Sequence, residues 1–300
     1  NVQMQNTVQD ILNDRSNLQV DVNNGDPTDS DGVPLLQASA TIIDYKTGQV
    51  KVLIGGRGNQ PSASLNRAYF DLKSIGSTTK PLTVYGPAID TKLITAGTPL
   101  DDTSVSEEIL EKYNFGSVVP KNADGSMFGY ITAREALTYS KNLTSIKTVD
   151  MLGLDTALNY GKKAGLKYAP QSHTMSALAL GQFDQPIGNR DGGNTTILAS
   201  AYGAFGNNGV IYEPALYTKV EDASGNLLLE KEPISTKLFS PQTSYIIYDI
   251  LKGSSTSAQF NDIPVAGKTG TTNSSDNFWF AGLTPYYSGS VRIGYDNPQR

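Results

Sequence analysis

The chain has 300 residues and a formal net charge of −5, and 38% of its residues are hydrophobic and 18% charged. This composition is typical of a globular protein with one large domain or two small ones, and the absence of a basic patch argues against nucleic acid as a partner. The lack of cysteine excludes disulfides, thiolate nucleophiles and Cys-ligated metals, and the single histidine, His173, lies in a polar stretch typical of a solvated loop. No metal or cofactor is therefore expected.

Residues 1–36 are predicted to form an N-terminal helix and a linker that lead into the main domain. Val8, Ile11 and Leu12 recur at helical spacing, and residues 23–32 are rich in Asp, Asn, Gly and Ser. The chain opens without an initiator methionine and contains neither a signal-peptide pattern nor an apolar run that could span a bilayer. We therefore expect an excised piece of a longer protein, with the main domain over residues 37–300 and its C-terminal end truncated.

Along the rest of the chain, strand patterns lie at both ends and helical patterns lie between them. Helices are expected to begin at Ser77, after the capping box of Thr132 and Glu135, at Asp155 and after Asn194, and another passes through residues 146–152. Strands are expected over residues 38–44, 49–54, 217–221, 226–230, 264–270, 278–283 and 290–295. Residues 98–128 show no periodicity and are expected to be a long ordered loop. The pattern predicts an α+β fold in which one largely antiparallel sheet joins both ends and helices cover it.

Three short motifs carry residues that can perform acyl transfer without histidine or cysteine. They are Ser77-Thr78-Thr79-Lys80, Ser140-Lys141-Asn142 and Lys268-Thr269-Gly270-Thr271. Each motif is weak alone, and Lys46-Thr47-Gly48 repeats the letters of the third one inside a predicted hairpin turn. Position distinguishes the third motif from this copy, because Lys268 follows the other two motifs and lies on a predicted strand.

The surroundings of each motif indicate a role in a shared site. Ser77 follows Gly76 at a predicted helix start, where backbone N–H groups lack intrahelical acceptors, and Lys80 lies three residues on along the same face. Ser140 is placed at a helix end, where a loop can present polar side chains to a cleft. Gly270 on its strand would let the backbone of a ligand approach closely.

These residues resemble the penicillin-binding transpeptidase family, in its order and with similar separations. The resemblance extends from about residue 37 to 295. Over this range the chain is most similar to the transpeptidase domain of bifunctional, class A penicillin-binding proteins of Gram-positive bacteria. Flanking stretches that carry it are Asn66-Arg67-Ala68, Gly129 to Leu137, Ala199 to Gly209 and Trp279 to Pro285. It implies a five-stranded, largely antiparallel sheet flanked by helices, as in serine β-lactamases and transpeptidases.

The resemblance also implies a mechanism. Ser77 would attack the carbonyl between two terminal D-alanines of a peptidoglycan stem peptide, with Lys80 as its base, and an amine of a neighbouring stem would resolve the acyl-enzyme. The remaining roles it implies are proton relay by Ser140 with Lys268, substrate contacts from Asn142, Thr269, Gly270 and Thr271, and oxyanion binding by the N–H groups of Ser77 and Thr271. β-Lactams would acylate the same serine. The full-length protein would be anchored at the extracytoplasmic face of the cell membrane and would carry a glycosyltransferase domain.

Alternatives remain open at the level of sequence. A D,D-carboxypeptidase differs mainly in its acceptor, and a non-catalytic sensor of β-lactams or cell-wall peptides would keep Ser77 and Lys80. A serine β-lactamase needs a base for deacylation, yet no glutamate occurs between Glu135 and Glu213. Asp184 or Asp191 would have to replace it.

Overall fold

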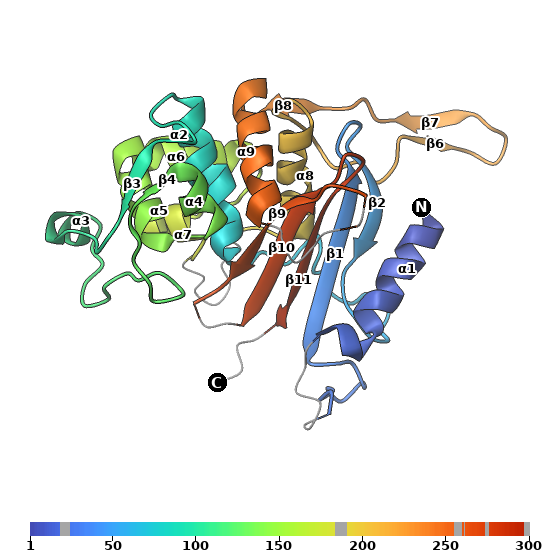
Figure 1. The fold of residues 1–300 in the computed structure, drawn as a ribbon. Coiled ribbons are helices and arrows are strands. Elements are labelled where there is room, and N and C mark those ends of the chain that lie inside the picture. The colour runs from blue at the N-terminus through green and yellow to red at the C-terminus, as the bar shows by residue number, and fades with distance from the viewer. Residues whose placement is uncertain (19–24, 184–190, 255–259, 261, 274–275, 297–300) are drawn as a thin grey trace.

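A single antiparallel sheet brings the two ends of the chain together (Figure 1). The computed structural model describes residues 1–18, 25–183, 191–254, 260, 262–273 and 276–296. The sheet has the strand order β2-β1-β11-β10-β9. Its strands are β1 (Leu36–Asp44), β2 (Gln49–Ile54), β9 (Ala266–Thr271), β10 (Asn277–Leu283) and β11 (Ser288–Tyr295). Since β1 pairs with β11, the predicted joining of the chain ends in a five-stranded sheet is confirmed.

Helices cover both faces of this sheet, as the alternation of its side chains requires. Helix α1 (Val2–Asn13) packs on β2 and β1, against Ala38, Ala40, Val52 and Ile54, and is followed by the short 3₁₀ helix η1 (Arg15–Leu18). Helices α8 (Thr195–Gly203) and α9 (Pro241–Ser254) lie on the opposite face, where α8 contacts β1, β10 and β11 and α9 contacts β9. Thr41 of β1 meets the Thr195 hydroxyl of α8 at 2.9 Å.

A second, helical layer lies beside the edge strand β9 and carries two of the three motifs. Its elements are the 3₁₀ helix η2 (Gly76–Thr79), the π-helical turn η3 (Pro81–Tyr85), α2 (Gly86–Asp90), α3 (Glu107–Lys112), α4 (Ala133–Thr138), α5 (Asn142–Leu152), α6 (Leu154–Lys163), η4 (Pro170–Ser172) and α7 (Met175–Leu180). The short strands β3 (Pro99–Asp102) and β4 (Gly129–Thr132) pair beside them. Helix α8 continues into η5 (Ala204–Gly206).

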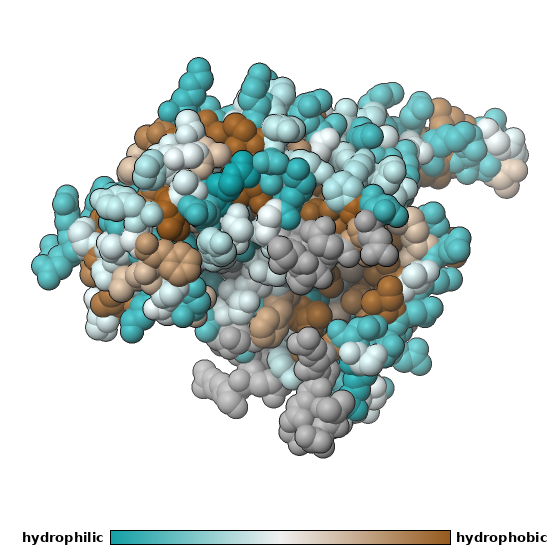
Figure 2. All heavy atoms as spheres, in the orientation of Figure 1, coloured by the Kyte–Doolittle hydropathy of each residue, from teal (hydrophilic) through white to brown (hydrophobic). Residues whose placement is uncertain are grey.

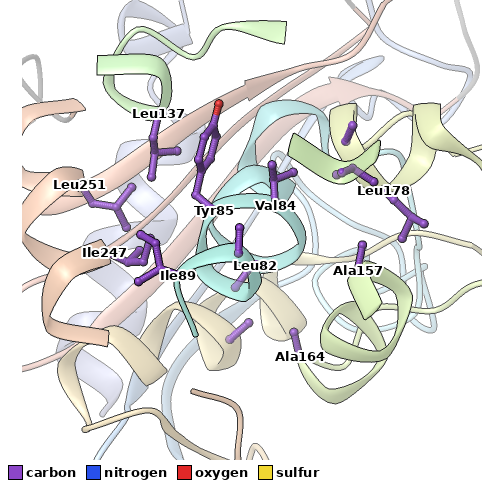
Figure 3. Packing of buried hydrophobic residues seen from close by; sticks show 14 of the residues in the cluster. Leu82, Val84, Tyr85, Ile89, Leu137, Ala157, Ala164, Leu178, Ile247 and Leu251 are labelled. Atoms are coloured by element: carbon purple, nitrogen blue, oxygen red, sulfur yellow. The ribbon is translucent and has the colours of Figure 1, made fainter. Parts of the chain in front are cut away.

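The core joins the helical layer to the sheet layer. Figure 3 shows Leu82, Val84 and Tyr85 of η3 between residues of α4, α7 and α9, and these three side chains are fully buried. Burial of each large apolar side chain stabilises the fold by roughly 1.5–3 kcal/mol. The segment that directly follows Ser77 and Lys80 is therefore a rigid central element, which fixes the position of both residues.

A hairpin projects from the main body at the upper right of Figure 1. It consists of β6 (Lys219–Glu221) and β7 (Leu227–Glu230), as predicted, while β5 (Val210–Tyr212) pairs with β8 (Ser235–Lys237) near its base. Leu227, Leu228 and Leu229 are each more than half exposed, and apolar surface is visible along the hairpin in Figure 2. Among the described residues, no helix has the length and apolar character needed to cross a bilayer.

Some local expectations are wrong. The helix expected to be capped by Asp155 begins at Leu154 with Gly153 as its N-cap, since the backbone turns at Gly153 with φ of 85°. Residues 98–128 contain β3 and α3 rather than only loop, because each element is too short to show periodicity. Helix α9 was not predicted. The capping box of Thr132 and Glu135 and the N-cap at Asn194 are confirmed.

Candidate active site

The turn that presents Ser77 is held in place by glycines on both sides. Gly76 has φ of 55°, and its amide and that of Ile75 both donate to the Gly181 carbonyl at 3.1 Å. A Cβ placed on Gly181 would lie 2.1 Å from the Gly76 oxygen, and one placed on Gly76 would lie 2.4 Å from the Thr271 oxygen. The chain can therefore lead into Ser77 along this path only because these two positions lack side chains.

Two buried aromatic side chains also bind the backbone of this turn. The Trp279 indole donates to the Ser74 carbonyl at 3.0 Å, and the Tyr202 hydroxyl donates to the Thr78 carbonyl at 2.8 Å. Both rings are buried, so each donor is directed by packing. Ser77 itself is partly exposed in the first turn of η2, where its backbone N–H has no intrahelical acceptor.

Lys80 is fully buried, and its amine is bound by the loop between α4 and α5. Its Nζ lies 2.7 Å from the Ser140 carbonyl, 2.7 Å from Asn142 Oδ1, 3.2 Å from the Lys141 carbonyl and 3.5 Å from Ser140 Oγ. Within the described residues, none of its hydrogen bonds goes to the Ser77 hydroxyl. The Lys80 amine therefore joins the first motif to the second. The expected contact between the Lys80 amine and the Ser77 hydroxyl, both in the first motif, is not formed among the described residues.

Ser140 takes a conformation that is unusual for a residue with a side chain. Its φ is 58°, in the left-handed region, which costs roughly 1–3 kcal/mol in a non-glycine residue. This bend directs both the Ser140 carbonyl and the Ser140 hydroxyl towards Lys80. Asn142 begins α5, and its side chain bridges Lys80 and the Lys121 carbonyl, to which its amide donates at 2.9 Å.

The third motif lies on the edge strand β9, against the nucleophile turn. Lys268 is 2% exposed, and its Nζ donates to the Thr269 carbonyl at 3.2 Å. Gly270 shares the pleat of Lys268, and a Cβ placed there would lie 2.3 Å from the Ile75 carbonyl and 2.9 Å from Thr78. The glycine was expected to let the backbone of a ligand approach. Instead, the backbone that approaches Gly270 is that of the chain itself, at Ile75.

Thr269 and Thr271 lie on the other pleat of β9 and are exposed. The Thr271 backbone nevertheless abuts the nucleophile turn, because a Cβ on Gly76 would lie 2.7 Å from the Thr271 nitrogen. The N–H groups of Ser77 and Thr271 therefore belong to adjoining segments, as an oxyanion-binding pair requires.

The electrostatics of the site favour a neutral amine at Lys80. Burial, together with the positive charge of Lys268, holds the pKa of Lys80 well below its ordinary value of 10.5, and Asp102 opposes this shift. Burial also lowers the pKa of Lys268 to about 8. Both amines therefore lose their protons more readily than a lysine in water, as acid–base chemistry near neutral pH requires.

Other candidates from the sequence lie elsewhere or are not described. Lys46 is exposed in the turn between β1 and β2, as predicted for this copy of the third motif. His173 is exposed. Asp191 is buried and accepts a 2.5 Å hydrogen bond from Ser172, while Asp184 lies outside the described residues. In the part of the chain that the structure describes, no cluster of three His, Asp or Glu side chains could hold a metal ion.

Gly181 and Tyr202, which support the nucleophile turn, are not among the residues predicted from the sequence. A glycine after the apolar run of α7 is typical of a helix C-terminus, and Gly181 has the left-handed φ of 67° that this signal predicts. The contact between Gly181 and Gly76 has no such signal, because it joins segments about 100 residues apart.

Comparison with known proteins agrees with this geometry. Solved structures of similar shape include penicillin-binding protein 1A from Haemophilus influenzae (TM-score 0.74, 21% identity, 91% of this chain and 46% of that one). A second is PonA1 from Mycobacterium tuberculosis in complex with penicillin V (TM-score 0.71, 20% identity, 89% of this chain and 72% of that one). The fold is thus that of the transpeptidase and β-lactamase class.

Sequence similarity identifies the family. The model of the penicillin binding protein transpeptidase domain matches residues 38–297, and the chain belongs to this family. It is 54% identical over 302 residues to penicillin-binding protein 1A of Clostridium perfringens strain 13, covering 99% of this chain and 44% of that protein. The corresponding protein of Clostridium acetobutylicum is 45% identical over 311 residues, covering all of this chain and 37% of the relative. The chain therefore spans about two-fifths of the length of these class A relatives.

Proposed function

We propose that this chain is a serine D,D-transpeptidase domain that cross-links peptidoglycan stem peptides through an acyl-enzyme on Ser77, and that β-lactams acylate the same residue. The observation that carries the proposal is the buried amine of Lys80. It lies three residues after Ser77 and is bound by Ser140 and Asn142, and burial together with Lys268 holds its pKa well below the ordinary value. Such an amine can act as a base at neutral pH.

The hydrogen bonds of Lys80 suit this role. Three carbonyl oxygens surround the amine, those of Ser140 and of the Asn142 side chain at 2.7 Å and that of Lys141 at 3.2 Å. A neutral amine has two N–H bonds, so when it donates to the two nearer oxygens its lone pair remains for the proton of Ser77. The Ser77 oxygen then forms a bond to the substrate carbonyl carbon, and the developing oxyanion is held by the N–H groups of Ser77 and Thr271.

Departure of D-alanine requires a proton on its nitrogen. The Ser140 hydroxyl, 3.5 Å from the Lys80 amine, can return this proton to the leaving nitrogen as the carbon–nitrogen bond breaks. The side chains of Lys268, Thr269 and Thr271 would bind the substrate carboxylate, and Asn142 would bind its amide. An acceptor amine from a second stem peptide then attacks the acyl carbon and releases Ser77.

We further propose that the full-length protein carries a glycosyltransferase domain and an anchor at the extracytoplasmic face of the membrane. The support is the similarity to proteins named penicillin-binding protein 1A over only about two-fifths of their length. Membrane fractionation of the full-length protein tests the anchor, and polymerisation of lipid-linked disaccharide tests the second activity.

A mass-spectrometry time course with a fluorescent penicillin tests the site. The wild-type protein should gain one adduct on Ser77 that persists for many minutes, and Ser77→Ala should gain none. Ser64→Ala, at an exposed serine of another Ser-x-Asn sequence, is the matched control and should label as wild type. Labelling of Ser77→Ala would refute the assignment, and rapid loss of the adduct would indicate a β-lactamase. Supplying a D-Ala-D-Ala stem peptide with and without an acceptor amine then separates a transpeptidase from a carboxypeptidase.

A further inference from the structure

Lys141, the middle residue of the second motif, is 1% exposed, although it carries no role in the proposed mechanism. Its ammonium lies 2.6 Å from Ser126 Oγ, 3.0 Å from Asp124 Oδ2 and 3.6 Å from the centroid of the Phe128 ring. A buried lysine is rarely found unless it is paired, so these contacts define a buried polar cluster beneath the loop between α4 and α5.

The base of this cluster is Asp102, which is fully buried at the end of β3. One carboxylate oxygen accepts from Asn122 Nδ2 at 2.8 Å, and the other accepts from the Phe128 amide at 3.0 Å and lies 3.7 Å from Lys141 Nζ. Asp102 is therefore the point at which β3, residues 122–128 and the second motif are joined.

Asn122 connects Asp102 to the first turn of α5. Its Oδ1 accepts from the amides of Asn142 at 2.7 Å and Leu143 at 3.1 Å, whereas the N-cap residue Lys141 makes no side-chain capping bond. Asn122 thus caps the helix from another segment of the chain. Since Asn142 Oδ1 binds the Lys80 amine, only Asn142 separates the cap from the proposed base.

We propose that Asp102 is a positioning residue which, through Asn122 and Lys141, holds the strained Ser140 and Asn142 against Lys80 in the acylation-competent arrangement. This inference rests on the proposed function of Ser77 and Lys80. The left-handed conformation of Ser140 needs such support, because an unsupported loop would relax to a more favourable backbone conformation.

The position of Asp102 also has an electrostatic consequence. Among the described residues, the charged groups that shift the Lys80 pKa are Lys268 from β9, which lowers it, and Asp102 from β3, which opposes that lowering. The Lys141 ammonium is directed away, towards Asp124 and Ser126. Loss of the carboxylate charge should lower that pKa further. Neutral Lys80 would then form at lower pH, so the acid limb of the acylation rate should move to lower pH.

Asp102→Asn tests the proposal, with Asp101→Asn as its matched control. Asp101 is the adjacent carboxylate, and it pairs with Lys147 at 2.8 Å on the outer side of the strand. The measured quantity is the second-order rate constant for acylation by fluorescent penicillin across a range of pH, at a temperature where circular dichroism shows each variant folded. In the pH profile of this rate constant, Asp102→Asn should lower the plateau by about tenfold or more and move the acid limb to lower pH. Asp101→Asn should change neither the plateau nor the acid limb.

A second variant tests the positioning of Asn142 without changing the charge near Lys80. Asn122→Ala removes the cap of α5 without changing charge, so it should lower the plateau and leave the acid limb in place. Wild-type plateaus in both Asp102→Asn and Asn122→Ala would overturn the inference while leaving the Ser77 acyl-enzyme intact. If Asp102→Asn does not fold, a wild-type plateau in Asn122→Ala alone overturns it. Absence of labelling in the wild-type protein would instead refute the proposed function.

Discussion

Replacement of Lys268 by methionine should stabilise the fold while impairing acylation. Burial lowers the pKa of Lys268 from 10.5 to about 8, so at neutral pH the folded chain retains a proton on an amine that is 2% exposed. The difference between the two pKa values corresponds to about 3 kcal/mol, which is the cost of burying the charged form. Methionine has a similar volume and no charge, so Lys268→Met should gain up to about 3 kcal/mol at pH 7.

The pH dependence gives this prediction its sign. The unfolded chain keeps the Lys268 proton up to pH 10.5, whereas the folded chain releases it above about pH 8. Between these values the unfolded state binds more protons, so the stability of the wild-type protein rises with pH. The advantage of Lys268→Met is therefore constant below pH 8 and disappears as pH approaches 10.5.

Urea unfolding followed by fluorescence of Trp279, the one tryptophan of the chain, measures this difference. Lys46→Met is the matched control, since Lys46 begins the same three letters but is exposed, and its effect should stay within about 0.5 kcal/mol. Equal stability of Lys268→Met and wild type at pH 7, or a difference that is the same at pH 7 and pH 10.5, would refute the reasoning.

Two further substitutions test the supports of the nucleophile turn. Gly181→Ala should reduce the rate of acylation by penicillin more than tenfold, because its Cβ would lie 2.1 Å from the Gly76 oxygen. Gly153→Ala is the control, since Gly153 also has a positive φ but no atom within 4 Å of an added Cβ. This variant should lower only the melting temperature. Equal acylation rates in these two variants would contradict the proposed contact. Tyr202→Phe leaves the buried Thr78 carbonyl without its donor and should cost about 1–3 kcal/mol in urea unfolding, and an unchanged midpoint would show that this hydrogen bond contributes nothing.

Elements with a local signature were predictable from the sequence. The hairpin of β1 and β2 follows from alternating side chains and a glycine-containing turn, and the start of α4 follows from its capping box. Helix α9 was missed, although its buried side chains recur at helical spacing, and the short β3 and α3 carry too few residues for a period to appear.

The candidate residues of the site could be named from the sequence, but their contacts could not. Ser77, Lys80, Ser140 and Lys268 could be named because their letters and order resemble a known family. That the Lys80 amine binds the Ser140 carbonyl and Asn142 rather than Ser77 could not be predicted, because it depends on the left-handed backbone at Ser140. No local pattern encodes that bend, and the side chains that we propose support it, those of Asp102 and Asn122, are distant from Ser140 in sequence.

Two buried lysines near the site, Lys141 and Lys268, differ in their ion pairs. Asp102 and Asp124 both lie near Lys141, and within the described residues no carboxylate forms an ion pair with Lys268. Lys268 is therefore a buried amine on the sheet side for which the described part of the chain supplies no carboxylate counter-ion. A substrate carboxylate bound at Lys268 would supply that charge, raise the pKa of Lys268 and recover the folding energy lost to its burial. Under the proposed function, the energetic cost of burying Lys268 and the affinity for the substrate carboxylate would have the same physical cause.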